Sequence, residues 1–219
     1  MESLKEKLQS PAFMMFVLYF FTALLLVIFL EKGTFLLWLN SRHNPFGNVF
    51  FRYVTHFGEG LVFVLVGIIF LFYRFYNLIL LVMVGFFQYI LVYLAKALIF
   101  NFPRPSIFYE GKEIVFNLVE GVKMEARYSF PSGHTATAFA LATLLICLTR
   151  NKLLQVLYML GAILVAISRI YLFQHFLVDT LVGALAGMFT AGLIWWYFTQ
   201  KNPDLLYHKS SLQRGLLKS

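Results

Sequence analysis

Long apolar runs dominate this sequence and limit what it can fold into. The first of them, Ala12 to Leu30, contains no charged residue, and roughly 18 apolar residues are enough to cross a bilayer as a helix. Hydrophobic residues make up 60% of the chain and charged residues 13%, whereas soluble domains have roughly 45–50% and 25%. We therefore expect an all-α, polytopic membrane protein.

Six apolar segments predict six transmembrane helices in one membrane-embedded domain that covers residues 1–219. Residues 1–11 are expected to form a cytoplasmic N-terminus, and residues 199–219 a polar C-terminal tail. After the first helix, Glu31 to Gly60 is polar and aromatic and indicates an interfacial segment. The expected spans are Ala12 to Leu30, Leu61 to Tyr73, Leu78 to Ala95, Thr135 to Leu148, Leu153 to Ile167 and Phe176 to Phe198.

The basic residues of the short loops indicate which side of the membrane each loop occupies. With the N-terminus inside, the 18 lysines and arginines divide equally between the two sides. The short connections at Arg74 and at Arg150–Lys152 are the informative ones, and both favour a cytoplasmic N-terminus. The long polar loop of residues 103–131 is then extracytoplasmic.

Three groups of polar residues stand at helix ends on that same predicted side. Helix order alone brings the groups together at one membrane surface. They are Lys96 and Arg104 in "KALIFNFPRP", Ser132, Gly133 and His134 in "PSGH", and Arg169, His175 and Asp179 in "SRIYLFQHFLVD".

These residue types suit a phosphate ligand. Arginine's planar fork matches phosphate oxygens, and lysine adds a point charge. Backbone N–H groups at Ser132 and Gly133 would precede a helix beginning near Thr135, where the helix dipole favours anions. Two histidines can supply a nucleophile and a general acid. Asp179 follows His175 by four residues, so on a helix it could orient the imidazole.

The motifs resemble those of the type 2 phosphatidic acid phosphatase (PAP2) family of membrane lipid phosphatases, over residues 96–179. The resemblance implies a phosphohistidine mechanism without metal or cofactor. His175 would attack phosphorus, Asp179 would hold its other nitrogen, and His134 would protonate the leaving oxygen. The phosphoryl oxygens would be bound by Arg104, Arg169, Lys96 and the Ser132–Gly133 backbone.

One spacing departs from the family pattern. Lys96 and Arg104 enclose seven residues, where six are usual. We expect a bulged turn at residues 101–103 to restore the reach of the lysine, whose alternative role is to extend from its helix end towards the membrane surface.

Three other classes of function compete with a phosphatase. An anion or lipid transporter is disfavoured because no half of the chain is repeated and the charges cluster at one face. A non-catalytic relative that binds lipid headgroups would not need His134, His175 and Asp179. Vanadium-dependent peroxidase chemistry is disfavoured by the membrane spans and the lack of a large soluble domain.

The spans favour a lipid-linked phosphate as substrate and membrane lipids as partners, with no nucleic acid and no obligate protein partner. The resemblance admits undecaprenyl pyrophosphate, phosphatidylglycerol phosphate, lipid A phosphates and phosphatidate. We expect a bacterial inner membrane, with the site facing the periplasm or exterior. The loop of residues 103–131 is expected to select the headgroup. His43, His56 and His208 are expected to be interfacial, and Glu59 a loop-end charge.

Overall fold

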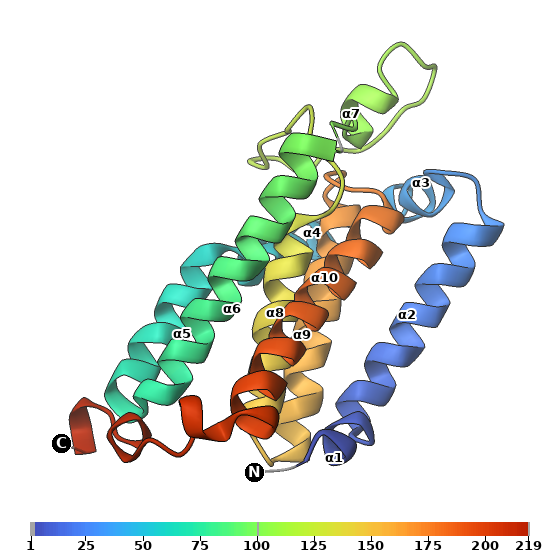
Figure 1. Cartoon of the computed structure of the whole chain (residues 1–219). Coiled ribbons are helices and arrows are strands. Elements are labelled where there is room, and N and C mark those ends of the chain that lie inside the picture. Colours follow the sequence, from blue (N-terminus) through green and yellow to red (C-terminus); the bar gives the residue numbers. More distant parts are fainter. Residues whose placement is uncertain (1–2, 100, 219) are drawn as a thin grey trace.

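The computed structural model describes residues 3–99 and 101–218. These residues form helices and connecting segments, and no strand occurs in the described part of the chain. The long helices run side by side, and the short helices α3, α4 and α7 gather at one end (Figure 1). Helix α1 and the C-terminal segments lie at the opposite end. We refer to the end with α3, α4 and α7 as the upper end.

The α-helices are α1 (Leu4–Leu8), α2 (Pro11–Phe29), α3 (Thr34–Asn40), α4 (Pro45–Val54), α5 (Gly60–Tyr73), α6 (Phe75–Leu94), α7 (Pro105–Phe108), α8 (Gly133–Leu148), α9 (Lys152–Tyr171) and α10 (Leu177–Trp196). Two π-helical segments follow α6 and α10, namely η2 (Ala95–Ile99) and η3 (Tyr197–Lys201). The 3₁₀ segments are η1 (Thr55–Gly58), η4 (Pro203–Leu205), η5 (Ser210–Gln213) and η6 (Leu216–Lys218).

The helical membrane architecture is confirmed. Among the described residues, 4 helices are long and apolar enough to cross a membrane, and a bent pair makes a possible fifth. They are Pro11–Phe29, Phe75–Leu98, Lys152–Tyr171 and Leu177–Lys201, with Pro45–Gly58 and Gly60–Tyr73 as the pair. Gly133–Leu148 is apolar but shorter. The count of six spans therefore remains a prediction.

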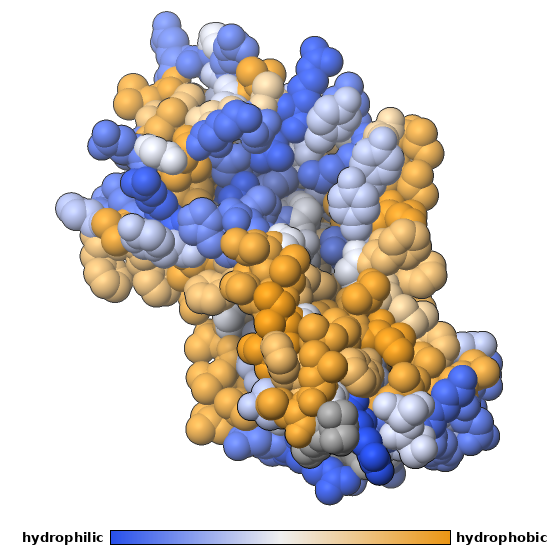
Figure 2. All heavy atoms as spheres, turned by 90° about the vertical axis from the view of Figure 1, so that its left-hand side faces the viewer, coloured by the Kyte–Doolittle hydropathy of each residue, from blue (hydrophilic) through white to orange (hydrophobic). Residues whose placement is uncertain are grey.

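The surface has the pattern that a membrane demands. Figure 2 shows an apolar band between a hydrophilic region at the upper end and a smaller one at the lower end. Large apolar side chains such as Phe29, Leu18 and Phe189 are more than half exposed. Because water would penalise such exposure, lipid is the environment that suits this band.

Several helices begin where a polar side chain caps them. Ser10 accepts from the Phe13 N–H with Pro11 at the first helical position, and Asn44 does the same for Gly47 before α4. Asn151 caps α9 by accepting from the Leu154 N–H. Each such cap stabilises a helix by about 1 kcal/mol.

The expected interfacial segment contains α3, α4 and η1. Helix α4 continues through η1 towards α5 with a bend of 58°. The bend turns η1 inward, where it packs against α8 and α9. Residues 55–58 thus reach the predicted site, which the sequence did not indicate.

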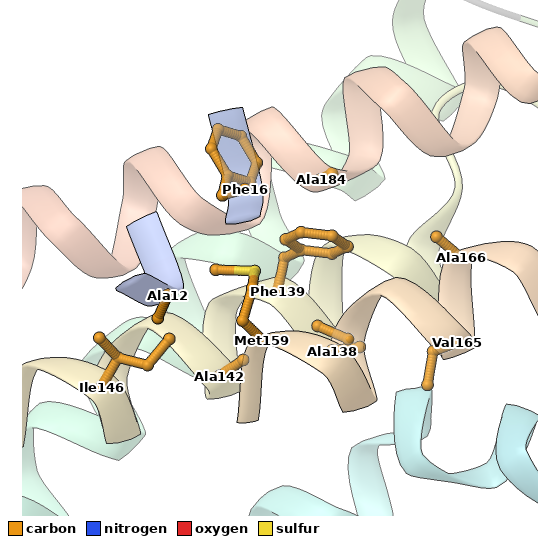
Figure 3. Packing of buried hydrophobic residues seen from close by; sticks show 11 residues of the cluster. Ala12, Phe16, Ala138, Phe139, Ala142, Ile146, Met159, Val165, Ala166 and Ala184 are labelled. Atoms are coloured by element: carbon orange, nitrogen blue, oxygen red, sulfur yellow. The ribbon is translucent and has the colours of Figure 1, made fainter. Parts of the chain in front are cut away.

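Helix α8 forms the centre of the bundle. Most of its side chains are buried, and it packs against α6, α9 and α10. Phe139 lies between Phe16 of α2 and Met159 of α9 in the core cluster of Figure 3. At 1.5 Å per residue, the 16 residues of α8 extend for about 24 Å. This length is less than the roughly 30 Å of the hydrocarbon core. Its neighbours shield it from lipid, so this short length is tolerated.

Helices α8 and α10 approach closely because α10 has glycines at the contact. A Cβ added to Gly187 would lie 2.1 Å from the Ala136 carbonyl oxygen, and one on Gly183 would lie 2.6 Å from that of Ser132. Small residues allow membrane helices to pack backbone to backbone in this way. This contact sets how far the N-terminus of α8 lies from the N-terminus of α10.

Gly187→Ala should therefore destabilise the protein by about 1–3 kcal/mol, because the new methyl group overpacks a backbone contact. Thermal unfolding in detergent, followed by circular dichroism, measures this. Gly192→Ala is the matched control on the same helix, since nothing lies within 4 Å of a Cβ there. Equal melting temperatures for the two variants would contradict the packing argument.

Candidate active site

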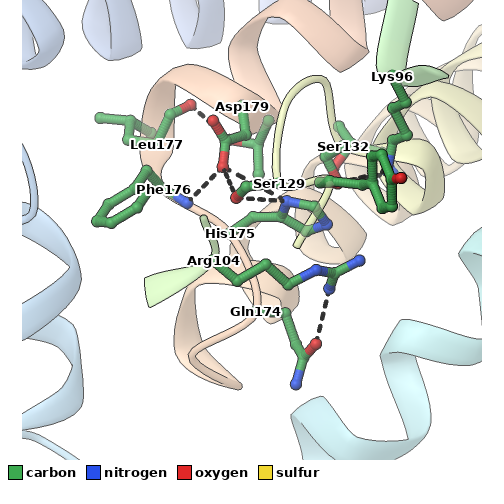
Figure 4. A network of polar contacts seen from close by, with 12 residues as sticks. Lys96, Arg104, Ser129, Ser132, Gln174, His175, Phe176, Leu177 and Asp179 are labelled. Carbon is green, nitrogen blue, oxygen red and sulfur yellow. Dashed lines mark hydrogen bonds and ion pairs between the residues drawn. The ribbon is translucent and has the colours of Figure 1, made fainter. Parts of the chain in front are cut away.

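A buried group of three side chains joins the starts of α8 and α10. Asp179 Oδ2 lies 3.4 Å from His175 Nδ1, accepts from Ser129 Oγ at 2.5 Å, and accepts from the Phe176 N–H at 2.9 Å (Figure 4). Ser129 Oγ is also 3.5 Å from His175 Nδ1. The carboxylate is thus fixed by two donors and faces one imidazole nitrogen, which leaves Nε2 for chemistry.

Burial controls the charge state of His175. The residue is 1% exposed and lies in the turn between α9 and α10. Burial first, and then the cations Arg104, Arg169 and Lys96, lower the pKa of this imidazole well below its ordinary 6.5. The ring is therefore neutral at pH 7.

Arg104 is held by the long loop and by the residue before His175. Its Nε donates to the Arg127 carbonyl at 3.0 Å, and Nη1 donates to Gln174 Oε1 at 2.8 Å. Its backbone N–H donates to the Ala126 carbonyl at 2.9 Å. Burial lowers the pKa of Arg104 from 12.5, but a guanidinium stays charged. Its positive charge therefore stands beside His175.

Arg169 occupies the last turn of α9, beyond the predicted end of that helix. Its Nη1 donates to Thr55 Oγ1 at 2.7 Å, and the side chain is 6% exposed. Its Nε is buried and has no hydrogen-bond partner among the described residues. Since an unpaired buried donor is costly, this atom is suited to an anionic ligand.

Lys96 also reaches the same region. Its Nζ donates to the Tyr128 carbonyl at 2.9 Å. The chain widens into the π-helix η2 (Ala95–Ile99), a form that accommodates an extra residue within a helix. The π-helix η2 lies within the stretch whose spacing departs from the family pattern, and the bulged turn at residues 101–103 remains a prediction.

The N-terminus of α8 supplies donors, with one correction to the sequence prediction. The Ser132 N–H donates to the Asp179 carbonyl at 2.9 Å, so this amide is already used within the protein. The Ser132 side chain caps α8 by accepting from Thr135. The amides of Gly133 and His134 belong to the first turn, where helices leave N–H groups unpaired. These two amides, not that of Ser132, are available to an anion.

A polar cavity of about 550 Å³ lies next to this network. The structure places the predicted residues His134, Arg104 and Arg169 on its wall. The backbone of η1 packs closely against His134, since a Cβ added to Gly58 would lie 2.7 Å from the His134 carbonyl oxygen. The remaining lining residues are Arg52, Thr55, His56, Glu59, Gly121, Val122, Lys123, Glu125 and Gln174.

Residues 121–125 belong to the loop that was expected to select the headgroup, whereas Arg52, Thr55 and Gln174 carry no motif and were not predicted. His56 and Glu59, expected to be an interfacial histidine and a loop-end charge, form a pair at 2.7 Å on the cavity wall. Ser129 stands three residues before Ser132, and a polar residue so close to "PSGH" was the one available signal. Gln174 likewise directly precedes His175. Thr55 is 114 residues from Arg169 in the chain, and no local pattern links them.

Comparison with known proteins identifies the family of this chain. The family model described as PAP2 superfamily matches residues 75–203, so this chain belongs to the PAP2 superfamily. Curated relatives include a lipid A 4'-phosphatase of Bacteroides thetaiotaomicron, 36% identical over 74 residues. This match covers 34% of the chain and 32% of the relative. A probable lipid phosphate phosphatase 4 of Arabidopsis thaliana is 31% identical over 121 residues, which cover 44% of the chain and 39% of the relative. The matches thus span between a third and two fifths of these relatives.

Two solved structures share the fold. Aquifex aeolicus LpxE has a TM-score of 0.66 and 30% identity, covering 76% of this chain and 95% of that one. A phosphatidylglycerolphosphate phosphatase of PAP2 type from Bacillus subtilis has a TM-score of 0.62 and 22% identity, covering 91% and 98%. At 22% identity, the second likeness concerns the fold alone.

Thr55→Ala should weaken the binding of inorganic phosphate by about tenfold, because Arg169 loses the partner that holds its guanidinium and a hydrogen bond to a charged group is worth roughly 1.5–3 kcal/mol. Titration calorimetry in detergent measures the affinity. Thr55→Ser keeps the hydroxyl and should bind like the unaltered protein. If serine fails as badly as alanine, the methyl group rather than the hydrogen bond matters.

Proposed function

We propose that this chain is an integral-membrane lipid phosphatase that works through a phosphohistidine on His175. It would hydrolyse a phosphomonoester or pyrophosphate on a membrane lipid. The observation that carries the proposal is the neutral, buried imidazole with Asp179 at Nδ1 and three cations around it. Such a set combines a nucleophile, its orienting group and phosphate-binding charges. Membership of the PAP2 superfamily supports the same reading.

In the first step, His175 Nε2 would attack phosphorus. The N–P bond forms as the bond from phosphorus to the lipid oxygen breaks, and His134 gives that oxygen its proton. Asp179 stabilises the positive charge that develops on the His175 ring through Nδ1. Ser129 and the Phe176 N–H hold the carboxylate in place for this role.

In the second step, water would attack the phosphohistidine. His134, now neutral, accepts a proton from that water, and the N–P bond breaks to release inorganic phosphate. In both steps, negative charge develops on the phosphoryl oxygens. Arg104, Arg169 and Lys96 are the cations that would stabilise it, together with the first-turn amides of α8.

The substrate would be a lipid whose phosphate reaches the upper end of the bundle while its tails stay beside the apolar band. Undecaprenyl pyrophosphate, phosphatidylglycerol phosphate, lipid A phosphates and phosphatidate all have this form. We further propose six spans, a cytoplasmic N-terminus and a bacterial inner membrane, with the site facing the periplasm or exterior. The position of α1 and the C-terminal segments at one end agrees with an even number of crossings (Figure 1).

Purified protein in detergent should release inorganic phosphate from one of these four lipids with EDTA present. His175→Ala should lower this rate at least about 1,000-fold, because the nucleophile is gone. Asp179→Asn should also lose nearly all turnover, because the amide cannot stabilise the charged ring. Circular dichroism should show that both variants keep their helices. Full activity in His175→Ala would disprove the nucleophile, and no release from any lipid would favour a transporter or a non-catalytic binding protein.

The pH dependence follows from the lowered pKa of His175. Its neutral form persists as the pH falls through 6.5, so protonation of the nucleophile should not limit activity there. We expect kcat/KM for the best lipid to keep its value down to pH 6.5 and to decline at lower pH. His56→Gln, which removes an exposed histidine from the cavity, should leave this acid limb in place. A decline centred at or above pH 6.5 in both proteins would contradict the expectation.

A further inference from the structure

The cavity described above contains cationic side chains in addition to those of the predicted phosphate site. Six charged side chains line it: Arg52, Arg104, Lys123, Arg169, Glu59 and Glu125. Arg104 and Arg169 belong to the predicted phosphate site, with Lys96 close by. Arg52 comes from α4 and has no part in the motifs or in the proposed mechanism.

Both carboxylates of the cavity already have a partner within the protein. Glu125 pairs with Lys123 at 3.2 Å, and this contact lowers the pKa of that carboxyl. Glu59 accepts from His56 at 2.7 Å. In the described part of the chain, none of the three guanidiniums forms an ion pair, since the partners of Arg104 and Arg169 are neutral. No carboxylate of the described residues is therefore in direct contact with these guanidiniums, although Glu125 and Glu59 lie on the same cavity wall.

The guanidinium of Arg52 lies against the long loop. A Cβ added to Gly121 would lie 2.7 Å from Arg52 Nη2 and 2.9 Å from Cζ, so the guanidinium lies directly against this glycine. Gly121 has a φ of +75° within a turn closed by the Val122 N–H and the Val119 carbonyl. The backbone conformation favours glycine here, and the absence of a side chain leaves room for the guanidinium. The guanidinium thus occupies a prepared place on the cavity wall.

We infer that Arg52, whose guanidinium lies beside Gly121 on the cavity wall, forms a second anion subsite in this cavity. It binds a second phosphate group on the substrate headgroup, while Arg104 and Arg169 hold the phosphate that reacts. The inference rests on the proposed function and narrows its substrate to lipids with two phosphates. Those two phosphates are either linked directly, as in a diphosphate, or carried at separate positions of one headgroup.

Binding of three small anions to the purified protein tests the subsite without depending on turnover. The anions are inorganic phosphate, methylenediphosphonate and butane-1,4-diphosphonate, which carry one group, two adjacent groups and two separated groups. Arg52→Gln should weaken the binding of one of the two diphosphonates by about tenfold, because a hydrogen bond from a charged group is lost. Its affinity for phosphate should change less than about twofold. The diphosphonate that is affected identifies which spacing the site accepts.

Matched variants separate the subsite from a general charge effect. Arg42→Gln removes an arginine that stacks on Trp38 at 4.0 Å, outside the cavity, and should change none of the three affinities. Gly121→Ala should reproduce the loss seen with Arg52→Gln, because the added methyl group displaces the guanidinium.

The inference is overturned if Arg52→Gln leaves the affinity for both diphosphonates unchanged, or if it lowers the affinity for all three anions equally. Failure of the proposed function has a different signature, namely no phosphate release from any lipid by the unaltered protein. The anion titrations test the subsite whether or not the unaltered protein releases phosphate from a lipid.

Discussion

The carboxylate of Asp179 is the group on which the arrangement of the site depends. It is 3% exposed, and a buried carboxylate costs several kcal/mol unless hydrogen bonds compensate it. Ser129 and the Phe176 N–H provide those bonds, and each comes from a segment that must then stay in place. Ser129 fixes the end of the long loop, and Phe176 fixes the start of α10. One charge therefore holds together the loop end, the helix start and the imidazole of His175.

Helix packing provides the frame around this group. The close contact of α8 and α10 at Gly183 and Gly187 sets the distance between the two helix starts. The bend between α4 and α5 turns η1 against α8 and α9, where Thr55 meets Arg169. The site is thus assembled from the ends of helices whose apolar lengths face lipid or the core. Its polar groups need not pass through the membrane.

Much of the fold could be predicted from the sequence because the apolar runs are long and the turns between them polar. The end of α9 could not be predicted, since a charged residue such as Arg169 marks a helix end by composition, whereas in the structure its Nη1 donates to Thr55 within the last turn. The motif residues could be gathered at one face by helix order. Thr55 and Arg52 could not, because the bend that brings them in depends on tertiary packing. The use of the Ser132 amide by Asp179 is likewise a tertiary contact that no local pattern reveals.

That last contact has a consequence for how the site can vary. The hydrogen bond from the Ser132 N–H to the Asp179 carbonyl joins the start of α8 to the start of α10, so the positions of the α8 amides and of the Asp179 carboxylate depend on each other. Residues 119–125 belong to the long loop, and the Lys123 carbonyl there accepts from Gln174 Nε2 at 3.1 Å. A change at the start of either helix is therefore transmitted to the start of the other, and a change in the loop reaches the turn before α10 through Gln174.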